Sequence, residues 1–178
     1  PKNSRIPYLA GSEQYNFVVK DLTKASNNKS IDWIIVTSFR PFYSSNTTHP
    51  GLDALQDTYH QLFEKYGVDV VLQAHNHNYQ RTHPIIFNSE RPGKPIIKDA
   101  NNTSTIQDPG VPVYITAGTG GAPSHELIAK SPFIANQFSD TGFLLVNITK
   151  TDTENQLQGA FHSSNNGTDI DHFSITKN

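Results

Sequence analysis

The segment VDVVLQAHNHNYQRTHP, residues 68–84, joins a run of apolar residues to two closely spaced histidines. Its first part, VDVVLQA, is short and rich in branched apolar residues, so it predicts a buried strand rather than a helix. His75 and His77 follow directly at the end of that strand. Ligand sites of open α/β sheets lie at the carboxyl ends of strands. The segment therefore predicts a central strand with a candidate ligand site at its end.

The residues before this segment predict the rest of a parallel unit. IDWIIVTS, residues 31–38, predicts a second buried strand, and apolar residues recur at helical spacing from Leu52 to Tyr66. Gly67 ends that helix. Strand, helix and strand with short joins form a βαβ unit, whose two strands are parallel. Further upstream, Ser12 predicts the N-cap of another amphipathic helix.

The second half of the chain alternates strand patterns with polar turns. YQRTHPIIF reads as a strand, residues 88–110 form a long polar stretch, and VPVYITAG is a strand that runs into the glycine-rich turn GTGGAPS. Three further strands, joined by polar turns, are predicted in GFLLVNIT, QLQGAFHSS and DHFSI. The sequence therefore predicts an α/β fold with parallel central strands and antiparallel strands from about residue 141 onward.

Composition narrows the classes of function. The 178 residues suit one domain, and a net charge of −2 gives no basic footprint for nucleic acid or for an anionic membrane. No apolar stretch approaches the ~20 residues of a membrane-spanning helix. The chain has no cysteine, which excludes disulfides, thiolate zinc sites and a cysteine nucleophile. We expect neither nucleic acid nor membrane as a partner.

Two features bear weakly on origin and location. The chain opens on Pro1 and contains no methionine, so it is expected to be a fragment or a processed product. Asn-X-Ser/Thr triplets lean toward an extracytoplasmic or secreted location, since they would accept glycans there. Their asparagines are Asn28, Asn46, Asn101, Asn102, Asn147 and Asn166.

The two histidines have two interpretations when they are considered alone. Residues i and i+2 of an extended segment project to the same side, so His75 and His77 could face one point and bind a metal ion such as Zn, Fe or Mn. The alternative is that both imidazoles only form hydrogen bonds with their neighbours in a polar turn. For an isolated His-X-His pair the second interpretation is favoured, since so short a pattern recurs by chance.

The surrounding segments resemble the calcineurin-like metallophosphoesterases, most closely their purple acid phosphatase branch. VDVVLQAHNHNYQRT resembles the family's apolar strand and G-H-x-H motif, with an aromatic residue and an arginine following in the order of Tyr79 and Arg81. Nearly the whole chain takes part, in the order and spacing of the family. The other matching segments are SEQYNFVVKDL, WIIVTSFRPFYSS, VPVYITAGTGGAP, DTGFLLVNIT and FHSSNNGTDIDHFSI.

The resemblance implies a fold, an activity and three site residues. The fold would be a metallophosphoesterase-like β-sandwich flanked by helices, and the reaction would be hydrolysis of a phosphate monoester. His75 and His77 would each bind one ion of a dinuclear centre of Fe, Zn or Mn, which clamps the ester and activates water. His49 would contact the phosphate and protonate the leaving oxygen. The remaining histidines are expected to be structural or on the surface: His60, His83, His125, His162 and His172.

The chain departs from the family pattern in two respects. Phe39 stands where the family places a metal-binding histidine, and Ala74 replaces the glycine of the G-H-x-H motif. The family's first three motifs, which supply the remaining ligands, have no counterpart before residue 12. Residues 1–178 are therefore expected to form the incomplete, C-terminal part of one metallophosphoesterase domain, inactive alone, weak in metal binding, and prone to self-association through exposed sheet surface.

Three functions remain open at this point. The first is that the parent protein is a metal-dependent phosphomonoesterase. The second is a pseudo-enzyme that keeps the fold for binding or structure after loss of the ligand at Phe39. The third and weaker one is a phosphodiesterase or nucleotidase of the same superfamily. The sequence gives no indication of the particular substrate.

Overall fold

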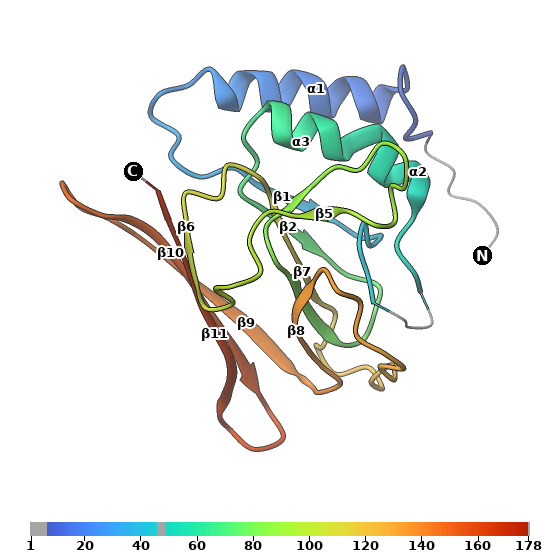
Figure 1. Cartoon of the computed structure of the whole chain (residues 1–178), viewed down its shortest axis with the longest axis vertical. Helices are drawn as coiled ribbons and strands as arrows, with labels where there is room; N and C mark the ends of the chain where they lie inside the picture. The colour runs from blue at the N-terminus through green and yellow to red at the C-terminus, as the bar shows by residue number, and fades with distance from the viewer. Residues whose placement is uncertain (1–6, 46–48, 178) are drawn as a thin grey trace.

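The computed structural model describes residues 7–45 and 49–177, in which two helical segments and a second sheet enclose a mixed five-stranded sheet (Figure 1). Its helices are α1 (Glu13–Ser26), α2 (Asp53–Leu55), the π-helix η1 (Gln56–His60) and α3 (Gln61–Lys65). The strands of the five-stranded sheet are β1 (Ile35–Ser38), β2 (Val70–Gln73), β3 (Tyr79–Thr82), β7 (Val113–Ala117) and β8 (Ile134–Phe138). The other strands are β4 (Ile85–Ile86), β5 (Ile96–Ile97), β6 (Thr105–Gln107), β9 (Gly142–Lys150), β10 (Asn155–Ser163) and β11 (Asp169–Lys177).

The predicted parallel unit is confirmed. The order of the larger sheet is β1-β2-β7-β3-β8, with β1, β2 and β7 parallel and with β3 and β8 antiparallel to their neighbours. The prediction of a buried strand holds for β2 and is wrong for β1. Residues of β1 alternate between exposed and half-buried, because β1 is the edge strand of this sheet.

Both predicted helices form, one of them with an irregular centre. The hydroxyl of Ser12 accepts a hydrogen bond from the backbone N–H of Tyr15 at 3.2 Å and caps α1. The helical pattern from Leu52 to Tyr66 is realised as α2, η1 and α3, so a π-helical turn interrupts it. Gly67 ends it with φ of +67°, a conformation that glycine adopts at little cost.

The second sheet comprises the three predicted C-terminal strands and one strand that the pattern did not predict. Its order is β6-β11-β10-β9, with β9, β10 and β11 antiparallel and β6 parallel to β11. The short strands β5 and β6 lie within the stretch predicted to be polar and irregular, and β8 was also not predicted. β5 and β6 have only two and three residues, too few for a periodic pattern, and the residues IANQF of β8 do not alternate between apolar and polar.

Two apolar cores occupy the two faces of the larger sheet. The first lies between the helices and the sheet and contains Leu22, Phe63, Val71 and Tyr114. The second lies between the two sheets and contains Val70, Ile115 and Phe161 together with Phe173. Adjacent residues of β2 and of β7 thus point into different cores, as alternation along a strand requires. The predicted β-sandwich flanked by helices is therefore present.

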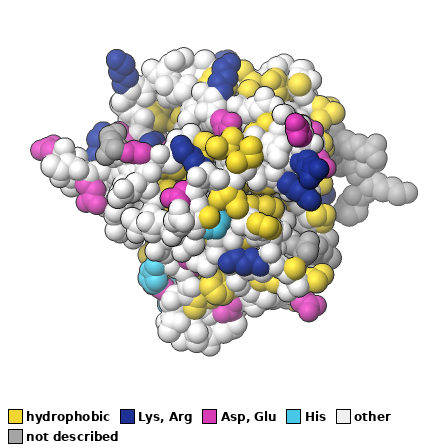
Figure 2. Space-filling model, in the orientation of Figure 1, with side chains coloured by type: hydrophobic (Ala, Val, Ile, Leu, Met, Phe, Trp, Pro, Cys, Tyr) yellow, Lys and Arg dark blue, Asp and Glu magenta, His cyan; other side chains and the backbone are white. Residues whose placement is uncertain are grey.

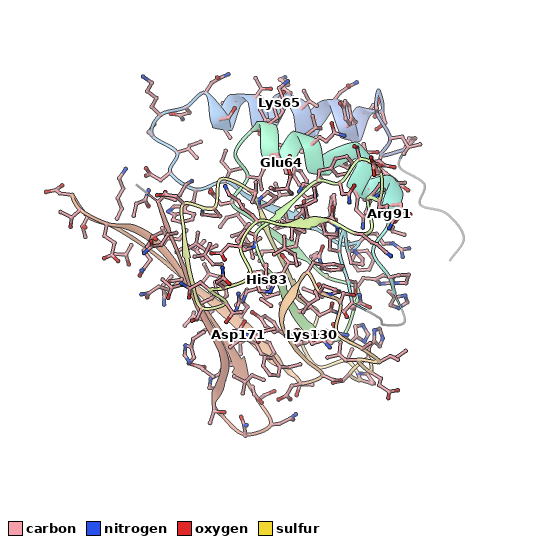
Figure 3. All side chains as sticks on the ribbon, in the orientation of Figure 1. Glu64, Lys65, His83, Arg91, Lys130 and Asp171 are labelled. Atoms are coloured by element: carbon pink, nitrogen blue, oxygen red, sulfur yellow. The ribbon has the colours of Figure 1, made fainter. Side chains whose placement is uncertain are left out.

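A buried polar group, here called the Asp171 network, joins the two sheets. Arg81 on β3 donates from Nε and Nη2 to the two carboxylate oxygens of Asp171 on β11, at 2.7 and 2.8 Å. Tyr79 and Asn136 donate to the same carboxylate at 2.7 and 2.6 Å. Figure 3 labels Asp171, which lies among the C-terminal strands. The network fixes β3, the strand that leaves the candidate site, against the second sheet.

Each sheet has an edge strand that bears exposed apolar side chains. β1, at the edge of one sheet, carries exposed Ile35 and is followed by Phe39, and β9, at the edge of the other, carries Phe143 and Leu145. Phe39, Phe143 and Leu145 are all more than half exposed. On the face drawn in Figure 2, acidic and basic side chains are interspersed without a continuous basic area. Among the described residues, the helices are too short or too polar to cross a bilayer.

Candidate functional site

The predicted site residues lie where the parallel strands of the larger sheet end. The segment between β1 and α2 carries three of the site residues, the segment after β2 carries the histidine pair, and the long loop after β7 returns to the same place. Carboxyl ends of neighbouring parallel strands meet at one edge, which is why these segments converge. The side chains that meet here are Phe39, Arg40, His49, His75, His77 and His125.

Four imidazole rings form a continuous row, here called the histidine cluster. The rings of His49 and His75 stack with centroids 3.9 Å apart, and those of His77 and His125 stack at 4.1 Å. The ring centroids of His49 and His125 are 5.1 Å apart and connect the two stacks. The structure thus brings His49, His75 and His77 together, with His49 and His125 between the two members of the pair.

The segment that carries the pair is bent, and the expectation of an extended segment was wrong. His75 has φ of +69°, in the left-handed region that only a few per cent of non-glycine residues adopt. The neighbouring residue Ala74 does not have a positive φ. The unusual conformation therefore lies at the histidine and not at the position where the resemblance implies a glycine. Because of this bend, His75 and His77 face different partners. Backbone strain of this kind is often found at functional sites.

A glycine after β7 allows the loop with the pair to sit close to its neighbour strand. A Cβ atom on Gly118 would lie 2.1 Å from the backbone oxygen of Asn76, which is much closer than real contacts allow. Asn76 in turn donates from Nδ2 to the backbone oxygen of His49 at 2.7 Å and to Ser44 Oγ at 2.8 Å. Gly118 and Asn76 together hold the loops of the histidine cluster in contact.

His77 is oriented in a way that suits a metal ligand. Its Nδ1 lies 3.0 Å from the carbonyl oxygen of Pro123, and a carbonyl only accepts, so Nδ1 carries the proton and Nε2 keeps its lone pair. The backbone N–H of His77 donates to Nδ1 of His125 at 3.1 Å, and the N–H of His125 donates to the carbonyl oxygen of His77 at 2.9 Å. These bonds fix both rings.

His75 has a different partner, the guanidinium group of Arg40. Nη1 of Arg40 lies 2.9 Å from Nε2 of His75. A guanidinium only donates, so Nε2 accepts this bond with its lone pair. Partial burial, followed by the positive charge of His49 and of Arg40, lowers the pKa of His75 below its ordinary value. The neutral ring that accepts from Arg40 is thereby favoured.

Phe39 covers the outer side of His75. The two ring centroids are 5.0 Å apart, and the phenyl ring is 67% exposed. It also lines an open groove whose opposite side is formed by β9, with Phe143 and Leu144. The position at which the resemblance implies a histidine is thus occupied by an exposed apolar ring rather than by a buried one.

The described residues fit a metal ion only in part. His77 presents a free Nε2 lone pair, whereas the Nε2 of His75 accepts from a permanent cation and would bind an ion only after Arg40 had turned away. Across residues 7–45 and 49–177, no group of three or more His, Asp or Glu side chains is arranged to hold a metal ion. The resemblance noted in the sequence would place a further metal-binding histidine at position 39, where this chain has Phe39.

The sequence did not single out two members of this site. His125 was expected to be structural or on the surface, yet it stacks on His77 and contacts His49. Its position after the strand VPVYITAG and the glycine turn places it at the same sheet edge, a signal that was available. Arg40 gave no comparable signal, because nothing in the sequence shows that its side chain turns toward His75. The other histidines that were predicted to be structural or on the surface fall into two groups. His60 and His83 are buried, and His162 and His172 lie beside the surface carboxylate of Asp169.

Comparisons with known proteins agree with the resemblance noted in the sequence. The chain is 33% identical to purple acid phosphatase 21 of Arabidopsis thaliana over 66% of this chain and 23% of that protein. It is 38% identical to Fe(3+)-Zn(2+) purple acid phosphatase 12 of the same plant over 61% of this chain and 22% of that protein. No protein-family model matches the chain.

A solved structure agrees with the fold. A purple acid phosphatase isolated from yellow lupin (Lupinus luteus) seeds superposes with a TM-score of 0.77 at 24% identity, over 97% of this chain and 29% of that one. The predicted metallophosphoesterase-like fold is therefore confirmed. The chain spans only about a fifth of the length of the curated relatives it matches.

Proposed function

Since the chain is a relative of the purple acid phosphatases in sequence and in fold, we propose that it forms the C-terminal part of a metal-dependent phosphoric-ester hydrolase that acts on phosphate monoesters. The observation that carries this proposal is the position of His75 and His77 at the end of β2, stacked with His49 and His125. On this proposal residues 1–178 belong to a single metallophosphoesterase domain, whose other ligands come from outside this chain.

The roles of the individual side chains follow from their surroundings. His77 would hold an ion through Nε2, and His75 would hold a second ion once Arg40 had moved from it. When bound, Fe, Zn or Mn ions would polarise the ester and activate water. His49 stacks on His75, which supports the proposed role in which it would contact the phosphate and protonate the leaving oxygen. Asn76 holds the backbone of His49 in position.

The test compares this chain with the full-length protein. Each is assayed with an aryl phosphate while Zn, Mn or Fe is supplied. We expect turnover by the full-length protein, its loss in the His75→Ala variant, and negligible turnover by residues 1–178. Turnover by the chain alone that His75→Ala abolishes would contradict the proposed incompleteness. An inactive full-length protein with metal supplied would contradict the hydrolase itself.

A specific observation also favours the second candidate, a pseudo-enzyme that binds a ligand without hydrolysing it. Phe39 cannot ligate a metal ion, and Arg40 occupies the nitrogen of His75 that would do so. Both residues follow β1 directly, so the two changes act on the same half of the site. The full-length assay separates the candidates, because only the hydrolase turns over substrate.

We further propose that the chain associates through its open sheet edges and that the protein is extracytoplasmic. The edge strand β9 carries the exposed ring of Phe143, and the exposed ring of Phe39 directly follows the edge strand β1, which supports association. The candidate glycosylation asparagines that the structure describes are all exposed: Asn28, Asn101, Asn102, Asn147 and Asn166. Asn46 lies outside the described residues. Light scattering of the purified chain and glycosidase treatment of the native protein test the two proposals.

A further inference from the structure

The charges in the histidine cluster have one sign. Arg40 and the other three histidines are the charged or ionisable groups that act on His75, and no carboxylate is among them. The same holds for His125, whose neighbours of this kind are His77 and His49. Elsewhere in the chain, cations such as Arg81 pair with carboxylates. Within the described ranges no carboxylate lies within ion-pair distance of Arg40.

Arg40 has three contacts with described residues, one through its backbone and two through its guanidinium group. The hydroxyl of Ser38 donates to the backbone oxygen of Arg40 at 2.9 Å, and the guanidinium carbon lies 6.0 Å from the centre of the Phe39 ring. One N–H of the guanidinium donates to Nε2 of His75. A guanidinium carries five N–H donors in a planar fork, so donors remain for a ligand beyond His75.

These donors are of the kind that recognises phosphate. Arginine binds phosphate oxygens through parallel, charge-assisted hydrogen bonds, and it stays protonated at any pH a protein encounters. Imidazole N–H groups add donors beside it, since the proton of neutral His125 lies on Nε2 when Nδ1 accepts from His77. An oxyanion at this position would therefore meet a permanent cation and several donors, and among the described residues no carboxylate acts on His75 or His125.

We propose that the histidine cluster and Arg40 bind a phosphoryl oxyanion without a metal ion, the guanidinium standing in for one cation of a metal centre. This inference rests on the proposed function for the class of ligand, a phosphoryl group. Unlike the proposed function, it requires no metal ion. The ligand is inorganic phosphate or the terminal phosphoryl group of a monoester. Arg40 is the residue on which binding depends, and His75 positions it.

The experiment titrates the chelator-treated chain with inorganic phosphate by isothermal calorimetry, with the chelator kept in the buffer. We expect saturable binding by the wild type and a loss of roughly tenfold or more in affinity for Arg40→Gln. Arg91→Gln removes the same charge from an exposed loop away from the cluster, labelled in Figure 3, and should bind like the wild type. A parallel titration with glycerol phosphate shows whether free phosphate or an ester is preferred.

A second readout separates a binding role from a structural one. Loss of Arg40 frees Nε2 of His75, so zinc binding to the chelator-free Arg40→Gln chain should become tighter while phosphate binding becomes weaker. A variant that had merely lost structure would bind both more weakly, and that result would overturn the assignment of Arg40. Since Arg40 is exposed, the melting temperature should stay unchanged.

Two other results would overturn the inference. One is phosphate binding by the wild type only after zinc is added, and the other is equal binding by wild type and Arg40→Gln. Failure of the proposed hydrolase is recognised separately, since an inactive full-length protein would leave the metal-free binding result in place. Conversely, the full-length protein could be active while the chelator-treated chain of residues 1–178 fails to bind phosphate. That result would contradict this inference and leave the proposed hydrolase in place.

Discussion

The Asp171 network and the histidine cluster contain similar kinds of side chain but differ in their pairing. In the network, the cation of Arg81 is fully buried and meets the carboxylate of Asp171 through two hydrogen bonds. In the cluster, Arg40 is exposed and its described partner is an imidazole. Complete pairing leaves little capacity to bind anything else, whereas an unpaired cation costs little at the surface and remains available to a ligand. The network therefore serves the fold, whereas on our proposal the cluster serves binding.

The largest effect is expected from breaking the buried pair. Asp171→Asn keeps the shape but leaves Arg81 buried without a counter-charge, so the free energy of unfolding should fall by about 3–5 kcal/mol. Asp32→Asn is the matched control, because its partner Lys150 is 60% exposed and such pairs contribute about 0–1 kcal/mol. Urea denaturation measures both. Equal losses of unfolding free energy in the two variants would contradict the expected difference between the buried and the exposed ion pair.

The pH dependence of stability should follow the same pair. Burial alone would raise the pKa of Asp171, but the hydrogen bonds and charge of Arg81 outweigh it and hold that pKa below the ordinary value. A carboxyl whose pKa is lower in the folded state stabilises the fold above its unfolded pKa, and this contribution is lost as the pH falls through the folded pKa. Thermal melts between neutral and acidic pH should therefore show a steeper acid loss in wild type than in Asp171→Asn. Parallel curves would assign the acid sensitivity to other groups.

A smaller effect is expected at the close approach beside the cluster. Gly118→Ala would place a methyl group against the backbone oxygen of Asn76, which should cost about 1–3 kcal/mol and displace the loop of His77. Gly120→Ala is the control, since a Cβ there meets nothing within 4 Å. Melting temperatures and the NMR shifts of the histidine side chains record the two consequences. If both variants behave alike, the loops are not held by this contact.

The smallest effect on stability is expected at Phe39. Because its ring is 67% exposed, Phe39→His should change the free energy of unfolding by no more than about 0.5 kcal/mol. In the full-length protein the new imidazole would stand beside His75, so metal content should rise toward two ions per chain and the phosphatase rate should increase. Metal analysis of both proteins side by side is the measurement. Unchanged stoichiometry would favour the pseudo-enzyme.

The sequence was informative where a residue pattern is long or where a cap is present. Ser12 marked the start of α1, and the three long C-terminal strands were found from their alternation. The parallel arrangement of β1 and β2 followed from the rules for βαβ units, and the end of β2 placed His75 and His77 at the sheet edge, whereas the position of β7 beside β2 was not predicted.

The features that were missed depend on contacts between distant segments. The exposure of β1 is a property of its edge position, and β6 exists only because β11 pairs with it. The bend at His75 and the turn of Arg40 toward it are set by loops that meet in space. Residue patterns within one segment carry no information about such meetings.

The span of the Asp171 network along the chain also bears on the kinetics of folding. Arg81 and Asp171 are 90 residues apart, so their pairing requires closure of a long loop and the docking of β11. During synthesis Arg81 therefore remains without this counter-ion until residue 171 has emerged. Contacts of this kind form late, and interactions absent from the transition state mainly slow unfolding. The network should thus determine how long a folded molecule persists more than how quickly it forms.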